Sequence, residues 1–237
     1  MKPGMPYAIA AMLLLAQAGL TPARAQTPDG HCTGAAFPDQ LGIARVAHSA
    51  AKVNFVRGAH SGPTCPSLTE ACRDRPFLMA GDVVLTSDKQ GDFVCATFVN
   101  TRAIETIGWL PAAALENVPV TPPPLAQWHG SWRRIEAQIR IKPAAGGALS
   151  IEGTAAWGSH DPDRVARGSV RVGEISATTK PAGDAVFFSD EPAPSFEKVP
   201  ESVCAVRMRR IAQYLVVEDN TSCGGMNVSF SGIYVRR

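Results

Sequence analysis

One short segment, Pro119-Val120-Thr121-Pro122-Pro123-Pro124, organises this chain of 237 residues into two halves. Proline fixes φ and lacks a backbone N–H, so the segment excludes a helix interior and a central strand and favours a stiff, extended spacer. Four cysteines precede the spacer and two follow it, so each half can close its own disulfides. We therefore expect two small β domains, at residues 51–118 and 127–237, joined by a proline-rich linker at residues 119–126.

Short apolar runs separated by turn residues recur in both halves, and runs of this length with two-residue alternation predict strands. Before the spacer we expect strands at residues 53–56, 81–86, 92–99 and 105–110, a turn at residues 87–91 and a polar insertion at residues 63–75. After it we expect strands at residues 133–141, 148–157, 169–177, 185–189, 204–211, 214–218 and 226–236. The pattern predicts an all-β fold, with a small barrel followed by an antiparallel barrel or sandwich.

Residues 133–141 show clear alternation. Ile135, Ala137, Ile139 and Ile141 fall on one face, and charged or amide side chains occupy the positions between them. A strand with one face buried and the other in water has this pattern. We therefore expect one continuous strand here, with Ile135 on the buried face.

The first 25 residues have the features of a secretory signal peptide. Lys2 provides positive charge, residues 8–15 form an apolar run, and Ala23-Arg24-Ala25 offers the small residues of a peptidase site. We expect cleavage after Ala25, export to the periplasm or the medium, and an N-terminal extension at residues 26–50. An uncleaved anchor is the alternative; no later stretch reaches the roughly 20 apolar residues that a membrane helix needs, so we expect no membrane span after cleavage.

Removal of the signal peptide leaves a chain without net charge. The full sequence has 23 basic and 21 acidic residues, and Lys2 and Arg24 leave with the signal peptide, so 21 of each sign remain. A chain without a basic excess lacks the electrostatic footprint that a nucleic-acid backbone requires. We therefore expect no nucleic acid among its partners.

All six cysteines lie beyond the predicted cleavage site: Cys32, Cys65, Cys72, Cys95, Cys204 and Cys223. An even number in an exported chain favours disulfides, and no pair has the C-x-x-C spacing of a thioredoxin-type site. Only Cys204 and Cys223 follow the spacer, so we expect them to pair; closing a loop of about twenty residues contributes roughly 3 kcal/mol. The other four permit three pairings, and all three stay open.

The segment Gly108-Trp109-Leu110-Pro111-Ala112-Ala113-Ala114-Leu115 resembles the end of bacterial SH3-like (SH3b) domains, which have a strand, a short helical turn and a last strand here. Residues 81–85 and 91–95 resemble the strand and the hairpin that precede this ending. The resemblance covers about 70 residues, from near Ala51 to near Val118. It implies a small SH3-like barrel that contacts cell wall or protein.

The aromatic groove with which eukaryotic SH3 domains hold proline-rich peptides is mostly missing from this chain. Phe93 stands where those domains usually have a tryptophan, Ala114 stands where they have the final tyrosine, and only Pro111 matches. We therefore do not expect recognition of proline-rich peptides. Trp109 and Phe93 are nevertheless the candidate binding residues of this half.

In the second half, Gly130-x-Trp132 resembles the G-x-W motif of lipocalin-like (calycin) barrels, in which the tryptophan plugs one end of the barrel. The closing run at residues 219–234 resembles the ending of many uncharacterised secreted bacterial proteins. Some periplasmic lysozyme inhibitors are also disulfide-tied β barrels of about this size. The resemblance implies a calycin-like antiparallel barrel for residues 127–237.

Two features of the second half are candidate binding surfaces. Arg207 and Arg209 contribute to a basic strand face that can meet an acidic protein, an anionic glycan or a lipid headgroup, unless nearby acids such as Glu218 neutralise it. Asp219 and Asn220 are candidates to line a binding lip. Their alternative role is to form the turns around Cys223.

No recognisable catalytic motif occurs, and we expect no cofactor, no metal and no catalytic residues. The cluster Ser159-His160-Asp161-Pro162-Asp163 contains possible metal ligands, but Pro162 favours a surface turn in which the aspartates supply turn chemistry. Trp128, Trp132 and Trp157 can face a ligand or fill the core, and the core is the favoured interpretation.

These features predict a secreted, noncatalytic envelope protein that binds peptidoglycan or an envelope protein. The alternative is a periplasmic inhibitor of a lysozyme-type hydrolase, motivated by the small disulfide-tied barrel and its basic face. A hydrolase with an unrecognised site is a third hypothesis, which a deep pocket with converging His, Asp or Glu would favour.

Overall fold

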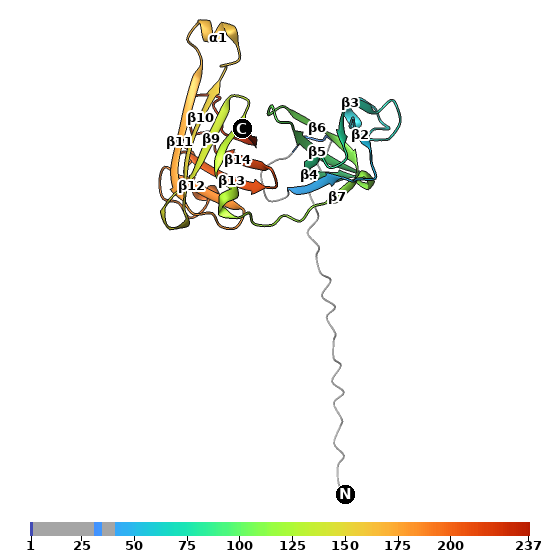
Figure 1. The fold of residues 1–237 in the computed structure, drawn as a ribbon, viewed down its shortest axis with the longest axis horizontal. Helices are drawn as coiled ribbons and strands as arrows, with labels where there is room; N and C mark the ends of the chain where they lie inside the picture. Colours follow the sequence, from blue (N-terminus) through green and yellow to red (C-terminus); the bar gives the residue numbers. More distant parts are fainter. Residues whose placement is uncertain (2–30, 35–40) are drawn as a thin grey trace.

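The computed structural model describes residue 1, residues 31–34 and residues 41–237. The described chain is all-β: the first half forms a seven-stranded sheet and the second half an eight-stranded sheet, which lie side by side (Figure 1). The predicted all-β fold is confirmed. The signal peptide and its cleavage after Ala25 lie outside the described residues, as do residues 26–30 and 35–40 of the predicted N-terminal extension.

The first sheet is curled into a half barrel. Its strands are β1 (Gly42–Val46), β2 (Lys52–Val56), β3 (Arg73–Met79), β4 (Val83–Gln90), β5 (Phe93–Val99), β6 (Glu105–Pro111) and β7 (Leu115–Asn117). They follow the order β3-β2-β6-β5-β4-β1-β7. The 3-10 turn η1 (Ala59–Ser61) follows β2, and η2 (Ala112–Ala114) separates β6 from β7. The predicted ending of strand, helical turn and last strand is therefore present.

Three features of this sheet differ from the sequence-based expectations. Strand β1 lies ahead of residue 51 and pairs with both β4 and β7, so residues 26–50 contribute a strand to the sheet. Strand β3 begins inside the insertion predicted at residues 63–75. The turn predicted at residues 87–91 is wrong, because β4 runs to Gln90. The pairing of β4 with β5 shifts register between Thr86 and Lys89, so residues 87 and 88 form an irregularity within the strand and not a turn.

The second sheet forms a nearly closed antiparallel barrel. Its strands are β8 (Gly130–Arg134), β9 (Ala137–Pro143), β10 (Leu149–Trp157), β11 (Arg171–Thr179), β12 (Ala185–Ser189), β13 (Ala205–Ile211), β14 (Tyr214–Asp219) and β15 (Gly232–Arg236). They follow the order β11-β10-β9-β8-β15-β14-β13-β12. The 3-10 turn η3 (Leu125–Gln127) precedes β8. The 3-10 turns η4 (Ala145–Gly147) and η5 (Phe196–Lys198) and the helix α1 (Pro162–Ala166) lie in connections between the strands.

The single strand predicted at residues 133–141 is wrong. The chain folds back as the β8–β9 hairpin, with Arg134 opposite Ala137 and a two-residue loop in which Glu136 has a φ of 61°. Ile135 occupies this loop and is 49% exposed, whereas Ala137, Ile139 and Ile141 are buried. The loop lacks the glycine or asparagine that usually marks such hairpins, so the alternation continues through it without an interruption.

Apolar side chains fill the barrel interior. The core contains Trp128 and Trp132, both fully buried, with Ile139, Leu149 and Phe230 packed in the same cluster. The favoured core role of Trp128 and Trp132 is therefore confirmed. Trp157 is partly buried and packs against the same cluster.

Strands β11 and β12 are the two ends of the barrel sheet and do not pair with each other as strands. The loop at residues 220–231 reaches across to β11, where the Gly225 amide donates to Val172 O at 3.2 Å. The approach is so close that a Cβ atom on Gly173 would lie 2.4 Å from Cys223 O. The disulfide Cys204–Cys223 ties this loop to the start of β13. A tethered loop therefore helps to close the barrel where strand pairing does not.

Three disulfides link the six cysteines in the described chain: Cys32–Cys95, Cys65–Cys72 and Cys204–Cys223. Each half closes its own bridges, and the last pair is the one predicted from the sequence. Disulfides are typical of proteins that fold in an oxidising compartment after export. None of the helices in the described ranges is long and apolar enough to cross a membrane.

The two sheets share an apolar cluster. Leu41, Ile43, Leu85, Val99 and Ala103 of the first half pack against Ile211, Tyr214, Val216, Ile233 and Val235 of the barrel. Polar contacts frame the cluster: the Tyr214 hydroxyl donates to Val83 O at 2.7 Å, and Arg133 Nη2 donates to Thr101 O at 2.7 Å. The halves are therefore joined by a buried contact as well as by the spacer.

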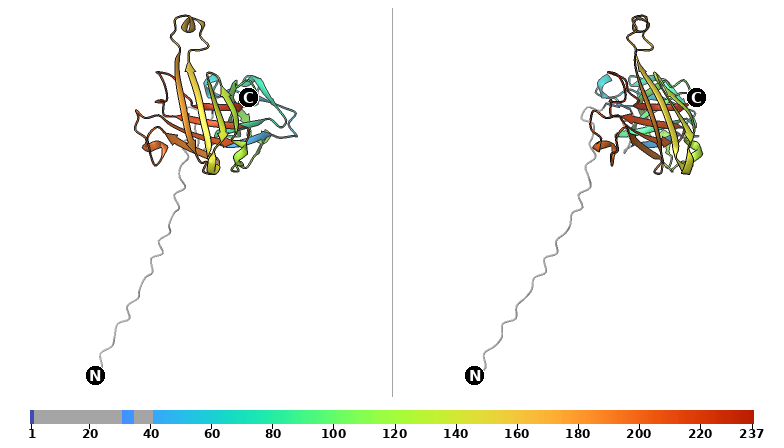
Figure 2. Two further views of the ribbon diagram at one scale, coloured as in Figure 1. Left: turned by 60° about the vertical axis from the view of Figure 1, so that its left-hand side comes forward. Right: turned by 90° about the vertical axis from the view of Figure 1, so that its left-hand side faces the viewer.

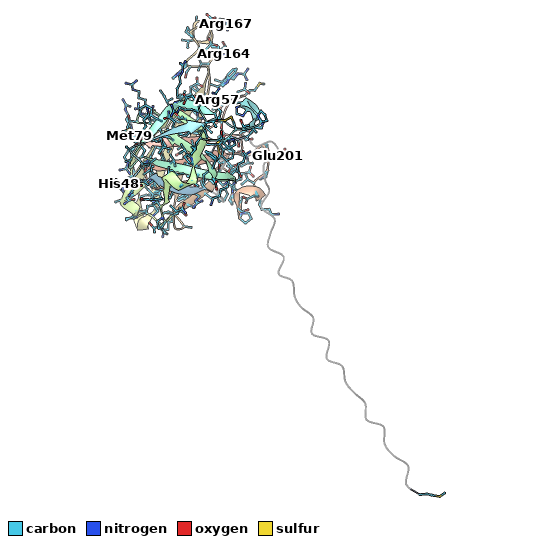
Figure 3. The ribbon with its side chains drawn as sticks, turned by 90° about the vertical axis from the view of Figure 1, so that its right-hand side faces the viewer. His48, Arg57, Met79, Arg164, Arg167 and Glu201 are labelled. Carbon is cyan, nitrogen blue, oxygen red and sulfur yellow. A yellow bond between two sulfur atoms is a disulfide. The ribbon has the colours of Figure 1, made fainter. Side chains whose placement is uncertain are left out.

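The β10–β11 hairpin extends well beyond the rest of the barrel and carries α1 at its tip (Figure 2). The side chains of Arg164 and Arg167 lie at this tip (Figure 3). The Asp161 carboxylate accepts hydrogen bonds from the amides of Asp163 and Arg164 and so caps α1. The aspartates predicted to make a turn therefore begin a short helix.

We expect Gly173→Ala to lower the free energy of unfolding by about 1–3 kcal/mol, because the added methyl group would collide with the backbone of the closing loop. Urea titration measures the change. Gly62→Ala is the matched control, since its Cβ would lie 3.8 Å from Cys65 Sγ, an ordinary contact. Equal stability of the two variants would contradict the closure described here.

We expect Tyr214→Phe to change the free energy of unfolding by an amount that depends on pH. Burial raises the pKa of Tyr214 from 10.0 to about 12, so the folded protein holds this proton more tightly than the unfolded chain does. The resulting contribution is complete below pH 10 and is lost as the pH rises towards 12. We expect the wild type to be more stable than the variant by about 1 kcal/mol at neutral pH, and this difference to be lost between pH 10 and pH 12. A difference that persists in alkali would contradict this.

Candidate functional site

A hollow of about 450 Å³ lies on the outside of the barrel beside β12, and we call it the β12 hollow. Its walls come from β12, β13, the 3-10 turn η5 and the end of the β11–β12 connection. The volume is within the range of small-molecule sites, roughly 300–1,000 Å³. Two candidates from the sequence, Arg207 and Arg209, line it.

Two aromatic rings form the apolar part of the β12 hollow. Phe187 and Phe196 meet edge to face, with ring centroids 6.5 Å apart and planes at 81°. The Arg207 guanidinium carbon lies 4.6 Å from the Phe196 ring centroid, on its face. Both rings are half-buried, so they offer apolar surface to a ligand and are held in place by their neighbours.

The two arginines of the β12 hollow form ion pairs with carboxylates. Arg207 contacts Glu218 at 2.6 Å and Glu197 at 2.9 Å, and Arg209 contacts Asp184 at 2.6 Å. The basic face considered from the sequence is therefore balanced by carboxylates. Planar guanidinium–carboxylate pairs present fixed donors and acceptors to a neutral polar ligand rather than a field that attracts any anion.

Glu197 is held as an anion at the rim of the hollow. Hydrogen bonds from its own backbone amide and from the Ser195 hydroxyl, with Arg207 nearby, lower the pKa of Glu197. A carboxylate held ionised in this way is a poor proton donor and a good hydrogen-bond acceptor. This chemistry suits binding better than acid catalysis.

Asp219 and Asn220 lie apart from the β12 hollow and hold the closing loop. The Asp219 carboxylate, 4% exposed, accepts from the amides of Phe230 and Ser231 at 3.0 and 2.9 Å and from the Ser229 hydroxyl at 2.6 Å. Asn220 accepts from the Ala205 amide at 3.0 Å and donates to the Val203 carbonyl at 2.7 Å. Their contacts therefore match the turn-forming role weighed for them in the sequence.

Trp109 and Phe93 also lie away from the β12 hollow. Trp109 is 1% exposed and packs with Cys72 and Cys95 in a cluster of the first sheet, and Phe93 packs against the same cluster. Trp109 is thus a core residue. Of the six predicted binding residues, Arg207 and Arg209 are the two that line the β12 hollow.

The described residues contain no group of three or more His, Cys, Asp or Glu side chains that could hold a metal ion. In the cluster at residues 159–163, Asp161 caps α1 and contacts Arg164 at 3.3 Å. The Ser159 hydroxyl donates to Glu136 at 2.9 Å. These contacts account for the cluster as a helix start.

Phe187 and Phe196 were missed from the sequence, although one signal was present. Phe187 and Phe188 are neighbours in a strand, so one large ring must point to each face. Phe188 packs against the barrel core, and Phe187 therefore faces outward into the β12 hollow. Large apolar residues on both faces of a strand indicate that something covers the outer face. The position of Phe196, on a turn distant in sequence, carries no such signal.

Comparisons with protein-family models, with curated proteins and with solved structures found no match to this chain.

We expect removal of the carboxylates that pair with Arg207 and Arg209 to increase the net positive charge of this surface. Asp184→Asn with Glu218→Gln leaves Arg207 and Arg209 with less compensation, so the double variant should elute from a heparin column at higher salt than the wild type. Asp92→Asn with Glu116→Gln changes the net charge equally at exposed positions of the first half and is the control. Equal retention of the two double variants would contradict the local neutralisation.

Proposed function

We propose that the protein is an exported, noncatalytic envelope protein that binds a cell-wall glycan in the β12 hollow. The observation that carries the proposal is the combination of the Phe187–Phe196 pair with ordered guanidinium–carboxylate pairs in one hollow. A sugar ring has an apolar C–H face that suits an aromatic ring and hydroxyl groups that suit paired donors and acceptors. The hollow offers both on adjacent walls.

Three further features support binding without catalysis. Core side chains fill the barrel interior, so the hollow lies on the outside of the barrel. The carboxylates Glu197 and Asp184 are both engaged by arginines. The disulfides fit a protein that works outside the cytoplasm, where cell-wall polymers are found.

The SH3-like and calycin-like resemblances stay predictions, and so does the alternative of a lysozyme-type inhibitor. The basic face that motivated the inhibitor is balanced by Glu197, Glu218 and Asp184 in the structure. Glycan binding is therefore the better-supported function.

Cosedimentation of the mature protein with purified murein tests the proposal. We expect saturable binding by the wild type and about tenfold weaker binding by Phe196→Ala, since one aromatic contact contributes about 1.4 kcal/mol. Phe77→Ala is the matched control, because Phe77 is 48% exposed on the first sheet and distant from the hollow in the fold. No saturable binding, or equal losses in both variants, would contradict the proposal. Unchanged lysozyme turnover in the presence of excess protein would separately exclude the inhibitor.

A further inference from the structure

A second hollow, of about 210 Å³, lies at the junction of the two halves, and we call it the junction hollow. It is walled by the spacer at residues 119–124 and the preceding Val118, by Ile43 of β1, by Gln127 and by residues 210–212 at the β13–β14 turn. Its volume is less than half that of the β12 hollow. It suits a single small group rather than a sugar chain.

Arg210 lines the junction hollow and is only 7% exposed. Its Nε donates to Gln127 O at 3.1 Å and its Nη1 donates to Tyr214 O at 3.1 Å. Its guanidinium carbon lies 4.8 Å from the ring centroid of Trp132. Three contacts therefore fix the group in one orientation at the wall of the hollow.

Arg210 has no carboxylate partner among the residues that the structure describes. Within residues 41–237, no ion pair joins Arg210 or Arg236 to an acidic side chain. The two guanidinium groups lie near the same Trp132 ring, Arg236 at 4.9 Å, and both donate to Gln127 O. Burial and the charge of Arg236 lower the pKa of Arg210 to about 10, so it is still protonated at neutral pH.

A buried cation next to a like charge is costly unless a counter-charge is supplied. Backbone carbonyls and the indole face supply part of the compensation. An anion in the junction hollow would supply the rest, and a planar guanidinium group matches the two oxygens of a carboxylate or phosphate.

We propose that the junction hollow binds a small oxyanion, a carboxylate or a phosphate group, through the guanidinium group of Arg210. The bound group would touch the spacer, the first sheet and the barrel at once. Because it binds only the folded junction, it stabilises the packing of the two halves by mass action. This site is separate from the β12 hollow and does not depend on glycan binding.

Ala212 provides a sharp test because it lines the junction hollow and has a φ of 47°, a region that aspartate and asparagine tolerate. Ala212→Asp supplies an internal carboxylate, whereas Ala212→Asn has nearly the same shape without the charge. Thermal unfolding is followed at constant ionic strength while sodium phosphate or sodium acetate replaces sodium chloride. A short peptide with a free or an amidated C-terminus forms a third arm.

We expect the melting temperature of the wild type to rise saturably with at least one oxyanion. Ala212→Asn should keep this response, and Ala212→Asp should melt higher in chloride and show at least tenfold weaker apparent affinity for the anion. A response to acetate and the free peptide identifies a carboxylate ligand, and a response to phosphate alone identifies phosphate. If the Ala212 variants do not fold, Thr121→Glu and Thr121→Gln repeat the comparison on the spacer wall. No saturable rise in the wild type, or equal responses in the paired variants, overturns the proposal.

Discussion

The apolar contact between the two sheets sets the geometry of the whole molecule. Side chains of β1, β4 and β5 meet side chains of β13, β14 and β15, and the Tyr214 hydroxyl spans the boundary to Val83 O. Burial of this surface is favourable only if both halves keep the same relative position, so the proline spacer follows a fixed path between them. That path creates the junction hollow and brings the spacer against Arg210.

Barrel closure depends on a second constraint, the loop at residues 220–231. Cys204–Cys223 limits the span of this loop, Asp219 satisfies its amides and hydroxyls, and Gly173 leaves room for its backbone. A buried carboxylate with this many donors is costly to leave unpaired, which holds the loop in a single conformation. Because the closed barrel holds β12 in place, Phe188 on its inner face packs against the core. Phe187 on its outer face meets Phe196 of η5.

Local sequence patterns predicted the presence of most strands better than they predicted where each strand begins and ends. Alternation gave the all-β class and most strands, and cysteine positions relative to the spacer gave the Cys204–Cys223 pair. The β8–β9 hairpin was missed because Glu136 adopts a positive φ without a glycine beside it. Strand β1 was missed because its five residues form a strand only through pairing with β4 and β7, which are distant in sequence.

The candidate site was harder to predict because it depends on contacts between distant residues. Arg207 and Arg209 were identified by their charge, and Glu218 was identified as a nearby acid that could neutralise Arg207. Asp184, the partner of Arg209, was missed because it lies on a separate segment that only the fold brings close. Asp219 is a charged residue of the kind that often binds ligands, but it is buried here and its carboxylate accepts hydrogen bonds from the closing loop. Burial and hydrogen-bond partners distinguish these roles, and neither can be read from the sequence.

The shared apolar cluster joins the two halves into one cooperative unit. Scanning calorimetry of the mature, disulfide-bonded protein tests this most directly. We expect one unfolding transition whose calorimetric enthalpy equals its van't Hoff enthalpy. Two separated transitions, one for each half, would contradict it.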